Sequence, residues 1–357
     1  MTTIKEIAKL ANVSAATVSN VLNGKGGAGE AKTKQIKDLA AKLHYTPNTL
    51  AKNLKQKRSK TIGIITEDLT VFNTPDIVDG IDAYCESNGF DIIIGNMRLF
   101  KKYNNNFTDT EKHKKLLDEV VSSMAAKQVE GIIYIGYHCR EIVYLPNIKS
   151  IPLVYAYCFP SDHSIPSVIY DDEQAAYDMT CLMIRSGHTQ IGVLCGPFSS
   201  FHTQERLRGF QKSLFENGIL YDNRLTVFGD WERKTGYQLG GRLITYGVTA
   251  IFCLNDTMAS GIYDYCADHS LTVGEDISLA GFDNKEICLA FRPQLTTIAP
   301  PLYEIGQKSA QIIIDEINGN GLDKGKIHIK MPCHIIERGS IKNLRNNRCL
   351  QESAKFK

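Results

Sequence analysis

The chain has 357 residues, 43% of them hydrophobic and 22% charged, which is the composition of a globular protein of two or three domains. No stretch is apolar over the ~18 residues that a membrane span requires, and the N-terminus lacks the apolar segment of a signal peptide, so we expect a cytoplasmic protein. The ten cysteines are scattered without the paired spacing of a zinc site, so we predict neither a metal nor another cofactor.

Positive charge is concentrated at the N-terminus. Residues 1–60 carry twelve Lys and Arg against three acidic residues, a net charge of +9, whereas the rest of the chain has a net charge of −7. A basic module joined to an acidic body favours contact with nucleic acid, although a solvated lysine-rich surface would show the same charge.

Three short helices are predicted within the first 45 residues. Apolar residues recur at helical spacing from Ile4 to Ala11, and Asn12 suits the left-handed backbone of a tight turn. A second helix runs from Ser14 to Leu22, and a third from about residue 31 to residue 43. Two short helices joined by a tight turn and braced by a third form a helix-turn-helix unit.

A fourth short helix is predicted after Pro47, with Asn48 as its cap and Leu50 and Leu54 on one face. A helix this short is unstable alone in water, so we expect DNA or a second copy of the chain to order it. The alternative is an ordinary linker.

These segments have a familiar sequence. TIKEIAKLANVSAATVSNVLN, followed by HYTPNTLAKNLKQKRSKTIGII, resembles the headpiece and hinge of the lactose-repressor (LacI/GalR) family of bacterial transcription regulators. Nearly all of the chain follows the family pattern. The resemblance implies a helix-turn-helix headpiece at residues 1–46, a hinge helix and linker at 47–60, a two-lobed body at 61–340 and a basic tail at 341–357.

Strands and helices alternate from Thr61 onward. This alternation predicts doubly wound parallel sheets, and over more than 200 residues it indicates an α/β body of two periplasmic-binding-protein-like lobes with a cleft between them. The polar segment 97–110 is expected to be a surface loop, with a lid over the cleft as the alternative. The predicted strands cover residues 61–65, 91–95, 131–136, 151–157, 167–170, 190–196, 226–229, 249–255 and 277–283.

Polar residues follow several of these strands, at the sheet edge where such folds bind ligands. Asp171 follows the apolar segment SVIY, Asn255 follows AIFCL and Asp283 follows LAGF. Arg206 lies early in a helix, and the only tryptophan is Trp231. Carboxylates, amides and Arg bind hydroxyl pairs, and indole stacks on the apolar face of a sugar, so we predict a sugar site. Taken singly, these residues could equally be helix caps, a surface ion pair or core.

The resemblance supports the sugar site and qualifies it. It implies that Arg206, Asn255 and Asp283 contact a small-molecule effector and that Trp231 stacks on it. Asn73 and Thr74 stand where the family usually carries an aromatic pair, so we expect a more polar pocket floor. A corepressed regulator that senses a purine or nucleoside is the alternative, and the direction of the response stays open.

On DNA, the resemblance implies a homodimer bound to a double-stranded operator. Ser14 and Thr17 would hold phosphates, while Ala15, Ala16 and Asn20 would face base edges in the major groove. Where the family often has Arg, Asn20 favours adenine, because Asn cannot make the bidentate contact of Arg to guanine.

The hinge completes the predicted DNA contacts. Asn48 and Leu54 would lie in the minor groove, where Leu54 resembles the wedge leucine that opens a central base step. Effector binding would form or melt the hinge helices and so control transcription. We expect the regulator to be a repressor.

Two other classes of protein are disfavoured by the sequence. An exported sugar receptor would share the two-lobed body but would have no use for a basic headpiece. An enzyme is not predicted, because the chain lacks G-x-S-x-G, H-E-x-x-H and Walker motifs.

Overall fold

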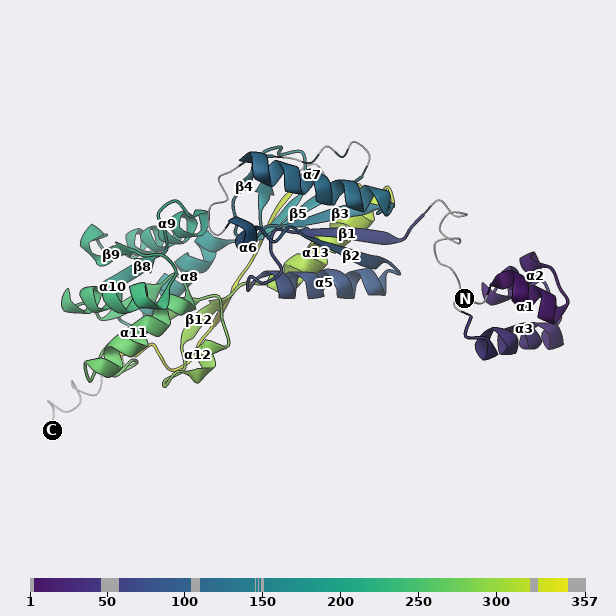
Figure 1. Ribbon diagram of the computed structural model, residues 1–357. Coiled ribbons are helices and arrows are strands. Elements are labelled where there is room, and N and C mark those ends of the chain that lie inside the picture. Colours follow the sequence, from purple (N-terminus) through teal and green to yellow (C-terminus); the bar gives the residue numbers. More distant parts are fainter. Residues whose placement is uncertain are drawn as a thin grey trace. The chain divides into compact units, whose positions relative to one another are not determined.

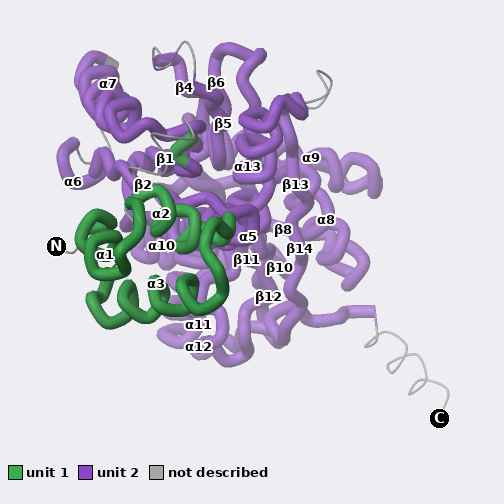
Figure 2. Tube along the Cα trace, turned by 90° about the vertical axis from the view of Figure 1, so that its right-hand side faces the viewer, with its two compact units in different colours: residues 1–59 green, residues 60–357 purple. Residues whose placement is uncertain are grey.

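The computed structural model describes residues 3–45, 58–103, 110–144, 146, 148, 151–321 and 327–345. The predictions made for Asn48, Leu54 and most of the C-terminal tail lie outside these residues. The chain divides into two compact units, residues 1–59 and 60–357, which Figure 2 colours separately. None of the described helices is long and apolar enough to cross a membrane.

The first unit is a three-helix bundle, as predicted: α1 (Ile4–Ala11), α2 (Ala15–Leu22) and α3 (Glu30–Lys42). A capping box starts α1, since the Thr3 hydroxyl accepts the Glu6 N–H while the Glu6 carboxylate accepts the Thr3 N–H. Asn12 ends α1 with a φ of 51°, which confirms the expected left-handed turn. The helices enclose a small core of Ile7, Ala8, Ala11, Val18, Val21, Ile36 and Ala40.

The second unit contains two six-stranded sheets, each the centre of one lobe (Figure 1). The sheet of the first lobe is wholly parallel, in the order β13-β7-β5-β3-β1-β2. Its strands are β1 (Thr61–Thr66), β2 (Asp91–Asn96), β3 (Gly131–Ile135), β5 (Leu153–Ala156), β7 (Ser167–Tyr170) and β13 (His328–Met331). A two-stranded ladder of β4 (Glu141–Ile142) and β6 (Phe159–Pro160) lies beside it.

The sheet of the second lobe has the order β14-β12-β11-β10-β8-β9 and is parallel except where β14 meets β12. Its strands are β8 (Ile191–Cys195), β9 (Thr226–Phe228), β10 (Ala250–Cys253), β11 (Ser278–Phe282), β12 (Thr296–Ala299) and β14 (His334–Ile336). The central strands β8, β10 and β11 are wholly buried because helices cover both faces, as parallel sheets require.

Helices cover both faces of each sheet (Figure 1). In the first lobe, α5 (Thr74–Ser87) and α13 (Leu302–Ile317) lie on one face, and α7 (Thr110–Ala126) lies on the other. In the second lobe, α8 (Asp172–Arg185) and α9 (Phe201–Glu216) oppose α10 (Arg233–Thr245) and α11 (Asp256–Asp268), with the short α12 (Ile287–Ala290) nearby.

The chain passes between the lobes three times, after β7, after β12 and between β13 and β14. The first crossing leads directly into α8, which packs tightly on α9. A Cβ added at Gly209 of α9 would lie 2.0 Å from the carbonyl oxygen of Glu173, so only glycine allows this approach. The close pairing brings the first turns of both helices to the boundary between the lobes.

The expectation of a surface loop at 97–110 was wrong for its first part. Residues Leu99–Tyr103 form α6, and the side chains of Met97 and Leu99 are buried against Leu117 and Tyr134. The segment is polar on average, so its composition did not indicate that these two apolar side chains pack in the core with α7 and the sheet. Residues 104–109 are outside the described part.

Candidate functional site

The exposed face of α2 is the candidate DNA interface. Ser14 caps the helix: its hydroxyl accepts the Thr17 N–H at 3.0 Å and lies 2.9 Å from the Thr17 hydroxyl. Ala16 and Asn20 lie one helical turn apart, and both are exposed, whereas Ala15 packs against the core of the bundle. The structure thus brings four of the five headpiece residues expected to contact DNA to the surface or the cap.

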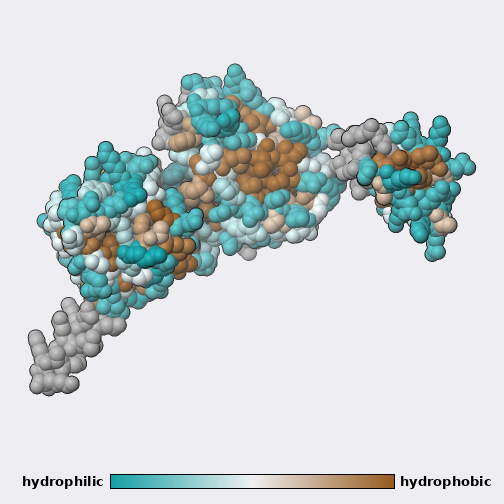
Figure 3. Space-filling view, turned by 60° about the horizontal axis from the view of Figure 1, so that its bottom comes forward, coloured by the Kyte–Doolittle hydropathy of each residue, from teal (hydrophilic) through white to brown (hydrophobic). Residues whose placement is uncertain are grey.

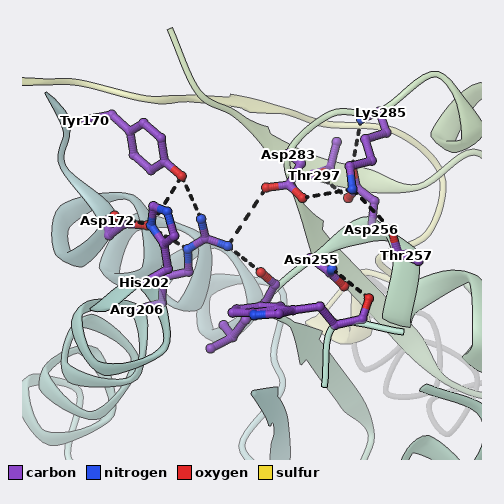
Figure 4. Close-up of polar contacts among 12 residues, drawn as sticks. Tyr170, Asp172, His202, Arg206, Asn255, Asp256, Thr257, Asp283, Lys285 and Thr297 are labelled. Carbon is purple, nitrogen blue, oxygen red and sulfur yellow. Dashed lines mark hydrogen bonds and ion pairs between the residues drawn. The ribbon is translucent and has the colours of Figure 1, made fainter. Parts of the chain in front are cut away.

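A buried ion-pair cluster lies where the second lobe begins (Figure 4). Asp172, the first residue of α8, accepts a hydrogen bond from Arg206 Nε at 2.7 Å and contacts His202 Nδ1 at 2.9 Å. All three side chains are at most 3% exposed. Burial opposes ionisation of Asp172, yet the charges of His202 and Arg206 lower its pKa below the ordinary value.

The other nitrogens of Arg206 are also engaged. Nη1 donates to the Leu254 carbonyl, Nη2 donates to the Tyr170 hydroxyl at 2.8 Å, and the guanidinium carbon lies 3.4 Å from the centre of the Phe282 ring. Its Nη1 is also 4.0 Å from Asp283, the contact that joins the two groups of side chains in Figure 4. Burial alone would lower the pKa of Arg206, but these acidic neighbours raise it above the ordinary value.

A second group of polar residues follows β10 and β11. The carboxylate of Asp256 accepts the Thr297 hydroxyl at 2.6 Å and the backbone N–H of Lys285 at 2.8 Å. Lys285 Nζ lies 3.6 Å from Asp283. Burial and the neighbouring carboxylate of Asp283 raise the pKa of Asp256 to about 7.

Stability should therefore depend on the ionisation of Asp256. Its pKa in the folded protein lies above that of an unfolded Asp, so folding takes up a proton between about pH 4 and about pH 7. We expect the free energy of unfolding to fall as the pH rises from about 5 to about 7, and Asp256→Asn to remove this part of the dependence. Urea unfolding at several pH values measures it, with the exposed Asp178→Asn as control; an unchanged slope in Asp256→Asn would contradict the assignment.

Trp231 and Asn255 follow β9 and β10, which flank β8 in the sheet, and a hydrogen bond joins them. Asn255 caps α11 by accepting the Met258 N–H at 2.8 Å, and its amide donates to the Trp231 carbonyl at 3.1 Å. Trp231 is half-buried with a φ of 74°, and a Cβ at Gly196 would lie 2.1 Å from its indole. Asn255 is thus a helix cap, the alternative considered from the sequence, that also holds the Trp231 loop.

Asn73 and Thr74 are the site residues expected in the first lobe, and both are fully buried. The Asn73 amide nitrogen donates to the Gly136 carbonyl at 3.1 Å, and the Thr74 hydroxyl donates to the Asp68 carbonyl at 2.9 Å. The Asn73 carbonyl oxygen has no partner among the described residues. The two polar residues expected at the pocket floor therefore lie buried at the start of α5.

Asp171 does not belong to the buried cluster. Its partly exposed carboxylate caps α8 by accepting the Gln174 N–H at 3.1 Å, and it lies 4.0 Å from Lys330. The carboxylate of the cluster is that of its neighbour Asp172.

His202 is the residue that sequence reasoning missed. It lies one helical turn before Arg206, a spacing that places both side chains on one face of α9. Its Nε2 is buried and has no partner among the described residues. The i, i+4 spacing to Arg206 was the available signal.

Several contacts show that this cluster lies where the two lobes meet. His138 of the first lobe bonds through Nε2 to the Ser200 hydroxyl of the second at 2.9 Å, and its ring centre is 4.6 Å from that of His202. Phe159 and Phe201 pack across the boundary with ring centres 5.2 Å apart. Burial lowers the pKa of His138 well below its ordinary value. Among the described residues, no group of three His, Cys, Asp or Glu side chains could hold a metal ion.

A capped three-helix headpiece and a two-lobed α/β body with a polar site at the lobe boundary define a ligand-responsive DNA-binding regulator. The sequence matches the family described as bacterial regulatory proteins, lacI family, over residues 3–48, and the periplasmic binding protein-like domain over residues 182–341. Catabolite control protein A of Priestia megaterium is 30% identical over 345 residues, covering 95% of this chain and 99% of its own.

Two further proteins share almost the whole length. The HTH-type transcriptional repressor PurR of Vibrio vulnificus (strain CMCP6) is 29% identical over 349 residues, covering 96% of this chain and all of its own. The structure of the lac repressor dimer bound to operator and the anti-inducer ONPF has a TM-score of 0.76 at 24% identity, over 96% of this chain and 99% of that one. The chain therefore belongs to the lacI family of bacterial regulatory proteins, which confirms the predicted family and fold class, and it is a DNA-binding transcriptional regulator.

Proposed function

We propose that this chain represses transcription as a homodimer, and that a sugar bound at the boundary between the lobes controls its affinity for operator DNA. The observation that carries the proposal is the buried Asp172–His202–Arg206 cluster at the lobe boundary of a chain that also bears a helix-turn-helix headpiece. Beside this cluster, the indole ring of the half-buried Trp231 can stack on a sugar ring. The sugar acts as a signal, and the protein releases it chemically unchanged.

Operator binding is the first test. A gel shift with a pool of duplexes at low salt should retard DNA through the basic headpiece, and the affinity should fall steeply as salt is added. A purified chain that retards no duplex would contradict the proposal and favour a sugar receptor without a regulatory role.

Asn20 is proposed to read one base. Its exposed amide can bond both N6 and N7 of adenine, so a binding-site selection should return adenine at one position of each half-site. Asn20→Ala should lose that preference while keeping the others. Asn23→Ala is the matched control, since the Asn23 amide already bonds to Ser19 of its own helix. Selection of guanine at that position, unaffected by Asn20→Ala, would contradict the assignment.

A hydrophobic surface supports the proposed homodimer. The first lobe exposes a patch of apolar residues in Figure 3. Among the side chains of this lobe, Ile94 and Phe100 are apolar and about two-fifths exposed. Ile94 lies on β2, an edge strand whose residues are only partly covered. Monomeric proteins rarely leave an apolar edge strand open, so we propose that the second copy covers it.

The proposed homodimer links the sugar to the DNA. Closure of the lobes around a sugar would shift the first lobes of the two copies and thereby the paired hinge segments that contain Asn48 and Leu54. The sugar changes operator affinity only by its different affinity for the DNA-bound and free conformations.

A further inference from the structure

An apolar groove lies on the second lobe, at the edge of the sheet where β8 begins. Its volume is about 450 Å³, and its floor consists of Ile191, Phe210 and Leu214, which belong to the core and are at most 4% exposed. Asn255 and Asp283 follow the ends of β10 and β11, and parallel strands begin at the opposite edge of a sheet from the one where they end. The groove is therefore separate from the polar site at the boundary between the lobes.

The groove suits a short apolar segment of peptide. On its rim, in the loop after α9, the side chain of Leu220 is 93% exposed. Among the described residues that line the groove, Asp222 alone is charged, and Arg224 pairs with its carboxylate at 2.7 Å. A stable protein partner buries about 800 Å² on each side, whereas a groove of this volume has room for only a few side chains.

The last described segment of the chain runs toward this groove. The backbone N–H of Lys342 donates to the Ser278 hydroxyl at the start of β11, at 2.9 Å, and the Lys342 carbonyl lies 3.1 Å from Nε2 of His188, just before β8. The N–H of Leu344 then donates to the carbonyl of Ser186, at the end of α8, at 2.8 Å. Because β11, β10 and β8 are neighbours in that order, the segment crosses the edge of the sheet from β11 toward β8.

The described segment ends beside the groove. A Cβ added at Gly187 would lie 3.4 Å from Cγ of Arg345, so Arg345 lies against Gly187. Thr189, which lines the groove, is two residues further along the chain and so at most about 7 Å from Gly187. Residues 346–357, with the sequence NNRCLQESAKFK, follow Arg345 and lie outside the described part of the chain.

We propose that residues 346–357 dock in this groove of their own chain, with the side chain of Leu350 inserted between α9 and the loop that follows it. Leu350 is the first large apolar residue after Arg345, and the five residues that separate them span at most about 17 Å. A segment tethered beside its site has an effective concentration in the millimolar range, so burial of a few apolar side chains is enough to hold it. Docking covers the floor of the groove and the exposed Leu220.

Hydrogen exchange of the full chain, followed by mass spectrometry, tests the docking from both sides. In the unmodified chain, we expect amides of residues 347–357 to exchange at least about tenfold more slowly than in Leu350→Asp. The same substitution should speed exchange in the loop 218–225, because the groove loses its occupant. Leu220→Asp should release residues 347–357 in the same way, and its exposed position leaves the fold intact.

Phe215→Asp is the matched control. Phe215 is 84% exposed near the end of α9 but does not line the groove, so this variant should protect residues 347–357 as well as the unmodified chain does. Equal exchange of residues 347–357 in the unmodified chain, Leu350→Asp and Leu220→Asp would overturn the proposal. Protection that disappears on about tenfold dilution would assign the groove to a second copy, and protection seen only with duplex DNA would assign the basic segment to DNA; either result would also overturn it.

Discussion

Replacing Asp172 by alanine should lower the free energy of unfolding by about 3–5 kcal/mol, because it removes the closest carboxylate from the buried guanidinium of Arg206. Arg206 is 3% exposed and cannot reach solvent without disturbing the packing between α8 and α9. The same change also frees His202 Nδ1 from its acceptor. Chemical denaturation followed by circular dichroism measures the loss.

The neighbouring residue provides the matched control. Asp171→Ala removes a partly exposed helix cap and should cost only about 1 kcal/mol. A double variant, Asp172→Leu with Arg206→Met, should recover part of the loss, because it removes the unpaired charge as well. Equal destabilisation by Asp171→Ala and Asp172→Ala would contradict the assignment of Asp172 to the buried cluster.

Replacing Leu54 by alanine should weaken specific operator binding by more than about tenfold, because the wedge that opens a base step is lost from both copies of the homodimer. Leu54 is outside the described residues, so this prediction comes from the sequence resemblance and from the shared face of Leu50 and Leu54. Fluorescence anisotropy of a labelled operator duplex measures the change, and calorimetry should show that sugar binding is retained.

Leu10→Ala is the control for this variant. Leu10 is a leucine of the same headpiece, 58% exposed on α1 and outside the proposed DNA face. The Leu10→Ala variant should bind operator with an affinity within about twofold of that of the unmodified chain. The same affinity in Leu54→Ala and the unmodified chain would remove the wedge role.

Periodicity was sufficient for most of the fold. The helices of the headpiece and the strands at the centres of both sheets were predicted within a few residues, because each is bounded by caps or by polar residues and buries a continuous apolar face. The resemblance, which extends over nearly the whole chain, supplied the two-lobed arrangement. The local hydrophobic pattern alone does not determine that the chain passes three times between the two sheets.

The failures occur where burial depends on distant parts of the chain. Strands β13 and β14 have mixed exposed and half-buried residues and pair with strands far away in the sequence, so their own pattern carries little signal. Arg206 was expected early in a helix, but α9 begins at Phe201, one turn before it, after the Ser200 cap. Met97 and Leu99 were judged by the polar composition of their neighbours.

The candidate site was predicted in outline. Arg206, Asp283, Asn255 and Trp231 do lie together at the ends of the strands in the second lobe, as parallel topology requires. The choice between Asp171 and Asp172 depended on which side chain points inward, and the role of His202 depended on a helix that begins at Phe201, one turn before Arg206. The sequence could not reveal that Arg206 is fully engaged within the protein, since Leu254 and Tyr170 reach it only in the folded chain.

The most direct test is a comparison of operator affinity in two states of the same protein. The full chain is titrated onto a labelled operator duplex, alone and with a saturating sugar that calorimetry has shown to bind. The account predicts that the dissociation constant for DNA changes by about tenfold or more, in either direction. The same dissociation constant with and without the bound sugar would contradict it.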